Sequence, residues 1–155
     1  MKAVVQRVKD AEVKVDGEIT GRIAWGLLVY LGVAREDSEK DADWMAEKTA
    51  NLRIFEDAQG KMNLSLLDIL AQDKSENGPV GILAVSQFTL LADASKGRRP
   101  FYGEAADPVK ANKLYEYFMT KVREKGLICE AGVFQAHMDV AYTNDGPVTI
   151  ILDSP

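Results

Sequence analysis

The stretch Gly26-Leu27-Leu28-Val29-Tyr30-Leu31-Gly32-Val33 decides the fold of this chain of 155 residues. Its apolar side chains occupy consecutive positions instead of alternate ones, which is typical of a strand buried on both faces. Such a strand lies inside a sheet, so the flanking segments have to supply neighbouring strands and covering helices. The apolar run is far shorter than the roughly 20 residues that cross a bilayer, so no membrane association is expected.

The residues before this stretch are predicted to form a β-hairpin. Apolar and polar side chains alternate over Lys2–Lys9, and the pattern continues over Ala11–Val15. Asp16-Gly17 is a common two-residue hairpin turn. Glu18–Ile23 then follows as the partner strand.

Two helices are predicted from their capping residues. Ser38 begins the first, and Asp41 stands three residues later, as in a capping box. Asp107 caps the second, Pro108 occupies its first turn and Gly126 ends it. The stripes expected to face the core are Ala42, Met45, Thr49 and Leu52 in the first helix, and Ala111, Leu114, Tyr115, Phe118 and Val122 in the second.

The rest of the chain adds strands and no linker long enough to separate two domains. A turn is expected within Glu56–Lys61 and a polar loop over Gln72–Gly78. Further strands are predicted at Val80–Val85, Leu127–Phe134, Met138–Thr143 and Val148–Leu152. We therefore expect one domain over residues 1–155 with a mixed α/β (α+β) fold, in which two main helices cover a strand-rich, barrel-like mixed or antiparallel sheet.

Charge and composition exclude several classes of protein. The net charge of −5 argues against a general nucleic-acid binder, but it permits a protein that grips only a few terminal nucleotides. His137 is the only histidine and no Cys/His cluster exists, so neither a metal nor another cofactor is predicted. Cys129 is the only cysteine, which fits a reducing compartment, and we expect it to pack in a strand. Because the N-terminal residues contain no signal-peptide core, a cytoplasmic protein is expected.

The first segment with chemical potential is Ser86-Gln87-Phe88-Thr89-Leu90, which follows the strand at Val80–Val85. A serine or threonine at a strand end can act as a nucleophile, but it needs a neighbouring base. The spacing of His137 does not place it beside Ser86. The alternative is that both hydroxyls satisfy backbone groups where the strand ends.

The second segment is Asn144-Asp145-Gly146-Pro147-Val148-Thr149. By itself, Asn-Asp-Gly-Pro between two strands is typical of a turn. A bond before proline is cis in only about 5–6% of cases in folded proteins. The chain also holds a similar segment, Asn77-Gly78-Pro79-Val80, which is interpreted as a plain loop.

In this order, and with this N-terminus, the segments make the chain resemble the D-aminoacyl-tRNA deacylase family over nearly its whole length. The residues that carry the resemblance are Ala3–Val8, Val15–Gly17, Gly26–Val33, Ser86–Leu90 and Asn144–Thr149. Two features depart from the family. The loop at Gln72–Pro79 is longer, and Arg99-Pro100 is followed by Phe101-Tyr102 where the family tends to have Ser-Phe.

The resemblance implies a homodimer that hydrolyses the ester of D-aminoacyl-tRNA in the cytoplasm. In the family a cis glycine–proline pair of one subunit enters the active site of the other, and this pair corresponds to Gly146 and Pro147. Arg7 resembles the arginine that supports this loop. Rigid carbonyls at this pair reject L-aminoacyl esters. Esters of D-amino acids are accepted, and so are esters of glycine, including glycine mischarged on alanine tRNA.

The resemblance also implies that the 2′-hydroxyl of the terminal adenosine assists the chemistry. Ser86 and Gln87 then position the ester, and backbone amides near Phe88 stabilise the oxyanion. Phe88 is a candidate contact for the adenosine, and Thr89 is the candidate for an essential hydroxyl. Lys96, Arg98 and Arg99 are candidate contacts for tRNA phosphates.

Two alternatives remain at this point. One is an esterase that uses Ser86 or Thr89 as its own nucleophile. The other is a module that binds the end of tRNA without catalysis.

Overall fold

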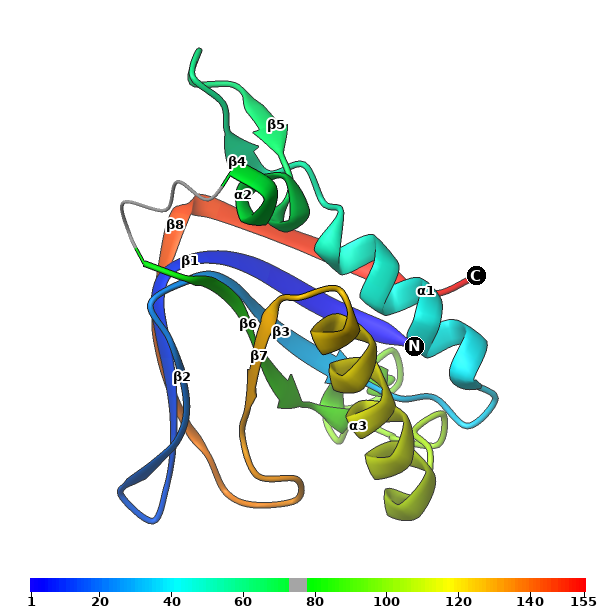
Figure 1. Cartoon of the computed structure of the whole chain (residues 1–155). Helices are drawn as coiled ribbons and strands as arrows, with labels where there is room; N and C mark the ends of the chain where they lie inside the picture. The colour runs from blue at the N-terminus through cyan, green and yellow to red at the C-terminus, as the bar shows by residue number, and fades with distance from the viewer. Residues whose placement is uncertain (73–77) are drawn as a thin grey trace.

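A computed structural model describes residues 1–72 and 78–155. Its main sheet (Figure 1) consists of the strands β1 (Lys2–Val15), β2 (Glu18–Ile23), β3 (Trp25–Gly32), β6 (Val80–Ser86), β7 (Ile128–Ala131) and β8 (Asp139–Asp153). The predicted hairpin of β1 and β2 and the buried strand β3 are confirmed, with β3 shifted by one residue.

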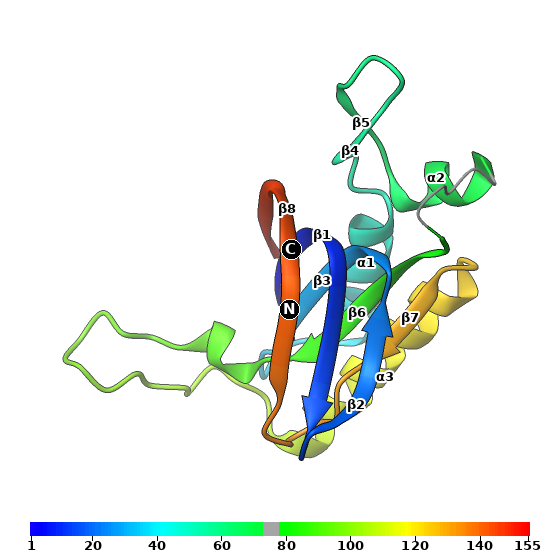
Figure 2. The same ribbon diagram turned by 90° about the vertical axis from the view of Figure 1, so that its left-hand side faces the viewer.

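The sheet is mixed and curled, as expected from the sequence. The strand order is β2-β1-β3-β6-β7, and β8 pairs with β1. β1 is antiparallel to β2, β3 and β8, whereas β3, β6 and β7 run parallel. Figure 2 shows β8 at one side of the sheet, next to β1. β1 therefore joins the antiparallel half of the sheet to the parallel half.

Two helices cover one face of the sheet (Figure 1), namely α1 (Glu39–Ala50) and α3 (Pro108–Glu124). Both predicted caps are present. The Asp41 carboxylate accepts a hydrogen bond from the Ser38 amide at 2.8 Å, and the Asp107 carboxylate accepts from the first amides of α3 at 3.0 and 3.1 Å. The inward stripes are confirmed, although Leu52 lies beyond the end of α1, where it is partly buried against the core.

A third helix was not predicted. α2 (Leu66–Gln72) follows a small sheet of β4 (Phe55–Glu56) and β5 (Met62–Leu64), which flank the predicted turn. The Ser65 amide donates to the Asp68 carboxylate at 2.8 Å, in the same capping pattern as at α1. Gln72 thus ends a helix instead of starting a loop. The remainder of the predicted loop, up to Asn77, lies outside the described residues.

The C-terminal strands differ from their predicted bounds. β7 covers only Ile128–Ala131, because the chain turns away from β6 after that point. The two strands predicted at Met138–Thr143 and Val148–Leu152 are a single strand, β8. Its pairing with β1 continues on both sides of the Asp145–Val148 segment, so this segment is a bulge within a strand and not a turn between two strands.

The core has two parts. The larger part lies between the helices and the sheet and includes Leu27, Met45 and Phe118, which are fully buried. A smaller cluster lies on the opposite face, where the strands curl, and consists of Val8, Ala11, Val13, Ile23, Leu28, Leu83 and Val85. Cys129 is buried as expected, and burial raises the pKa of its thiol to about 12.

Part of the opposite face is open. Val4 pairs with Tyr30 on one side and with Ile151 on the other, so the three side chains lie in one row across the sheet. The Ile151 side chain is 67% exposed. Burial and the neighbouring Tyr142 hydroxyl raise the pKa of Tyr30 to about 12. Among the described residues no helix is both long and apolar enough to cross a bilayer.

Candidate active site

Ser86 lies at the last position of β6, where it pairs with Leu31 of β3. The Gln87 amide donates to the Leu31 carbonyl at 2.9 Å. The chain then leaves the sheet in a short 3₁₀ turn, η1 (Phe88–Leu91). In the described part of the chain, the amides of Phe88 and Thr89 at the start of this turn have no hydrogen-bond acceptor.

The Thr89 hydroxyl has an amide as its partner. The side-chain N–H of Gln87 donates to Thr89 Oγ1. A donor directed at this oxygen withdraws electron density from it, whereas an adjacent base would activate it. The geometry therefore links the Thr89 hydroxyl to the Gln87 side chain.

A cavity of about 560 Å³ adjoins this turn. Ser86, Gln87 and Phe88 line one side, and the segment Phe134–Met138 lines the other. His137 belongs to this second wall, although its position in the sequence does not indicate it. The cavity therefore contains a serine and a histidine, and no hydrogen bond joins them in the described residues.

Arg7 lies opposite the bulge of β8. Val8 pairs with Asn144 and Gln6 pairs with Thr149, so residues 145–148 face Arg7 alone. The Arg7 side chain is buried, and its Nη1 donates to the Ile54 carbonyl at 2.6 Å. Its Nε lies 2.9 Å from Asp145 Oδ2, an ion pair in which the N–H is not aligned with the oxygen.

The Asn144 side chain closes the bulge. Its amide nitrogen donates to the Arg7 and Val148 carbonyls, both at 3.0 Å. Gly146 has a φ of 113°, and a Cβ at this position would lie 2.9 Å from Val148 Cγ2 and 3.1 Å from Arg7 Nη2. Only glycine fits this backbone conformation and this space without strain. The Gly146–Pro147 peptide bond is cis, and both residues are exposed.

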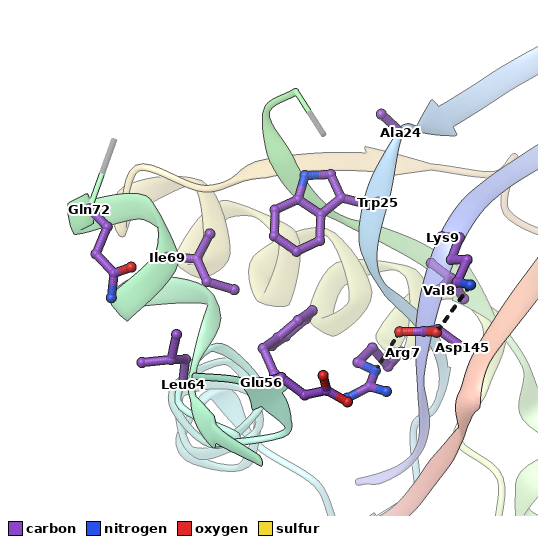
Figure 3. Close-up of a pocket in the computed structure, with 11 residues that line it drawn as sticks. Arg7, Val8, Lys9, Ala24, Trp25, Glu56, Leu64, Ile69, Gln72 and Asp145 are labelled. Carbon is purple, nitrogen blue, oxygen red and sulfur yellow. Dashed lines mark ion pairs between the residues drawn. The ribbon is translucent and has the colours of Figure 1, made fainter. Parts of the chain in front are cut away.

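A larger cavity, of about 740 Å³, lies beside the bulge (Figure 3). Arg7 and Asp145 lie together at one wall, Leu64 comes from the end of β5, and Ile69 comes from α2. Trp25 packs edge-on against Phe55, with 5.8 Å between the ring centres. None of the residues Ser86–Leu90 lines this cavity, so the cavity is separate from the candidate catalytic turn.

Within one chain the two functional segments do not meet. Ser86 is level with Ala3 of β1, whereas the bulge is level with Arg7. At about 3.3 Å per residue and about 4.8 Å between strands, they lie about 13 Å apart along the sheet and about 14 Å apart across it. Neither Gly146 nor Pro147 lines the cavity beside Ser86.

Comparison with known proteins identifies the family. The family model described as D-Tyr-tRNA(Tyr) deacylase matches residues 4–153. The chain belongs to this deacylase family. It is 59% identical to the D-aminoacyl-tRNA deacylase of Kosmotoga olearia, over 99% of this chain and 97% of that protein, and 57% identical to that of Geotalea uraniireducens, over 100% and 94%. This deacylase is therefore an enzyme that hydrolyses the ester of D-aminoacyl-tRNA.

Two solved structures resemble the deacylase over nearly their whole length. One is described as c-Myc DNA Unwinding Element Binding Protein, with a TM-score of 0.88, 41% identity, and coverage of 100% of this chain and 99% of that chain. The other, a probable eukaryotic D-amino acid tRNA deacylase, has a TM-score of 0.79, 16% identity and 97% coverage of both chains. The second likeness supports the fold alone.

The remaining candidate residues of the deacylase lie outside both cavities. Lys96, Arg98 and Arg99 are exposed in the loop that follows η1. Over the ranges 1–72 and 78–155, no cluster of three or more histidine, cysteine or acidic side chains is arranged to hold a metal ion.

Arg7 allows a direct test of the bulge. Replacing Arg7 with Ala removes a buried hydrogen bond to Ile54 and leaves the Asp145 carboxylate without its closest cation, at 2.9 Å. We expect the free energy of unfolding to fall by about 2 kcal/mol, measured by urea denaturation. Lys9→Ala is the matched control, because Lys9 is exposed and lies 3.7 Å from the same carboxylate, so its change should stay within about 0.5 kcal/mol. Equal losses in the two variants would contradict this role for Arg7.

Proposed function

We propose that this chain works as a homodimer in which each active site combines the Ser86–Leu90 turn of one subunit with Gly146 and Pro147 of the other. The observation that carries the proposal is the separation of these segments within one chain. The bulge is held by Arg7 and Asn144, yet its glycine and proline do not line the cavity beside Ser86 of the same chain. A second copy is the simplest source of the missing contact.

The open face of the sheet supports a second copy. The row formed by Val4, Tyr30 and Ile151 extends from the end of β3 to the outer strand β8. Ile151 is exposed and Val4 and Tyr30 are half-buried, and partly exposed apolar side chains that lie side by side are typical of surfaces that other proteins cover. A partner docked on this face would bring its β8 bulge close to the cavity beside Ser86.

The chirality filter senses the configuration at the Cα of the substrate through backbone atoms of the enzyme. It does not recognise the identity of the side chain. D-amino acids differ widely in their side chains, so complementary pockets would accept few of them. Backbone carbonyls of Gly146 and Pro147 instead hold the amino group and occupy the direction in which an L side chain would point. This excludes L substrates by collision, a form of specificity that relies on repulsion. Glycine has no side chain and passes the filter, so glycine mischarged on alanine tRNA is also a substrate.

The terminal adenosine supplies the hydroxyl that assists hydrolysis. Ser86 and Gln87 position the ester, and the free amides of Phe88 and Thr89 stabilise the developing oxyanion. Phe88 contacts the adenosine. The hydrogen bond that the Gln87 side-chain amide donates to Thr89 Oγ1 agrees with a role for the RNA hydroxyl in place of a protein nucleophile. We place this reaction in the cytoplasm and assign it to a single domain over residues 1–155.

One observation favours a second candidate, an esterase with its own nucleophile. His137 lines the cavity that also contains Ser86, and a histidine beside a serine is the usual pair for nucleophilic catalysis. This enzyme would form an acyl-enzyme on Ser86 and would cleave D-amino acid esters that carry no RNA. A binding module without catalysis would leave every ester intact.

The substrate range tests the filter directly. Purified protein in the presence of a chelator should cleave D-tyrosyl-tRNA and glycyl-tRNA and leave L-tyrosyl-tRNA intact. The measurement is the release of labelled amino acid over time. Cleavage of the L substrate at a similar rate, an intact glycyl ester or full inhibition by the chelator would each refute part of the proposal.

Mixing two variants tests whether the filter acts between subunits. Gly146→Ala strains the bulge backbone and should allow cleavage of L-tyrosyl-tRNA, whereas Gln87→Ala disables the cavity and leaves the bulge intact. After subunit exchange with excess Gln87→Ala protein, each working cavity faces an intact bulge from its partner. L cleavage should then fall while D cleavage persists. If Gly146→Ala protein is inactive, the mixture should regain D cleavage. A mixture that equals the sum of its separate components would show that the bulge acts within its own chain.

The source of the assisting hydroxyl is tested by two changes. A tRNA ending in 2′-deoxyadenosine, acylated with D-tyrosine at its 3′-hydroxyl, should remain uncleaved, because the assisting group is absent. The Thr89→Ala enzyme should keep kcat within about fivefold of the original, since the Thr89 hydroxyl takes no part in bond making. The opposite pattern, with the deoxy substrate cleaved and Thr89→Ala inactive, would favour a protein nucleophile.

A further inference from the structure

Residues 92–106 form an arm that leaves η1 and projects from the body of the molecule (Figure 2). Asp93 and Phe101 join its two sides through backbone hydrogen bonds of 2.8 and 2.9 Å. The returning side is anchored to the end of the sheet, because the Ala106 amide donates to the Val33 carbonyl at 2.9 Å. The base of the arm is thus held beside the cavity, and its tip reaches into solvent.

The tip of the arm is basic. Residues 94–100 include Lys96, Arg98 and Arg99 and no acidic residue, and all three side chains are exposed. This is a local excess of positive charge in a chain whose net charge is −5. Asp93, the nearest acidic residue along the chain, accepts hydrogen bonds from Ser95, which lower its pKa and hold it within the turn. The tip is therefore complementary to a polyanion.

Aromatic rings connect this tip to the cavity. Phe88, which lines the cavity, packs against Tyr102 with 5.1 Å between ring centres and 65° between planes. Phe101 comes next and is 68% exposed. Its ring lies over Gly103, where an added Cβ would be 2.2 Å from the Phe101 ring. The glycine thus leaves room for the ring at this position, and most of the ring surface stays exposed.

We propose that this arm binds the single-stranded 3′ end of the tRNA, on the 5′ side of the terminal adenosine. Bases stack on Phe101 and Tyr102, and the phosphates contact Lys96, Arg98 and Arg99. Exposed aromatic rings beside a positive charge are what binding of single-stranded RNA requires, because every base has a face that stacks. The inference rests on the proposed function in one respect, namely that the ester lies beside Phe88. RNA that leaves the cavity there passes Tyr102, then Phe101, then the tip.

Fluorescence anisotropy measures the binding of the RNA tetranucleotide ACCA and so tests the stacking. Phe101→Leu should weaken binding about tenfold, because leucine offers no stacking face. Phe101→Trp should retain affinity. Gly103→Ala should weaken binding as well, since it displaces the Phe101 ring without removing it. Val109→Ala, at a highly exposed position on α3, is the matched control and should change nothing.

The salt dependence tests the phosphate contacts. Each phosphate contact to a single strand contributes about −0.7 to the slope of log affinity against log salt concentration. Replacing Lys96, Arg98 and Arg99 together with Gln should therefore flatten the slope by about 2. An unchanged slope would overturn the role of the tip, and unchanged affinity in Phe101→Leu would overturn the role of the rings.

Kinetics separate this inference from the proposed function. With D-tyrosyl-tRNA, Phe101→Leu should raise KM about tenfold and leave kcat unchanged. With D-tyrosyl-adenosine, which lacks the upstream nucleotides, Phe101→Leu should match the original enzyme. Equal losses on both substrates would show that Phe101 acts at the ester or on the fold, and would overturn the proposal. If Gln87→Ala does not reduce cleavage of D-tyrosyl-adenosine, the proposed catalytic site is refuted. Binding of RNA to the arm can still be measured in that case.

Discussion

The pairing of β1 with β8 around Arg7 is the constraint on which the rest of the structure depends. Residues 145–148 have to fit opposite one residue of β1, and the ladder resumes on both sides of them. Such a bulge leaves carbonyls and a carboxylate without ladder partners. The Arg7 guanidinium contacts Asp145, and the Asn144 amide bonds the Arg7 and Val148 carbonyls. The bulge is therefore a rigid feature of the sheet, able to present backbone atoms in fixed positions.

Much of the fold follows from local patterns. The caps at Ser38 and Asp107 and the turn at Asp16-Gly17 depend on neighbouring residues, so the sequence indicates them directly. α2 was missed although Ser65 and Asp68 carry the same capping pattern, because seven residues are too few to show a helical period. The Asn144–Pro147 segment was interpreted as a turn because its composition is that of a turn. Only the opposing strand keeps it within a sheet.

The candidate site was predictable in part for the same reason. Ser86 stands at the end of an apolar strand, and the position of that strand end is readable from the sequence. The place of His137 in the cavity that Ser86 also lines is not readable, because it depends on β7 pairing with β6 and on the turn that follows. The role of Tyr102 likewise appears only when its ring is seen against Phe88. Contacts between distant segments are where sequence patterns stop being informative.

The bulge also has a consequence for how β8 avoids pairing edge to edge with foreign strands. β8 is 15 residues long and, in the described residues, pairs on one side only. A long regular outer strand offers a row of free amides and carbonyls on which foreign strands can grow, and this is a common start of aggregation. The distortion at 145–148 interrupts that row near its middle, so an incoming strand can register with only a short piece at a time. The irregularity that displays Gly146 and Pro147 thus also limits the sheet to its own strands.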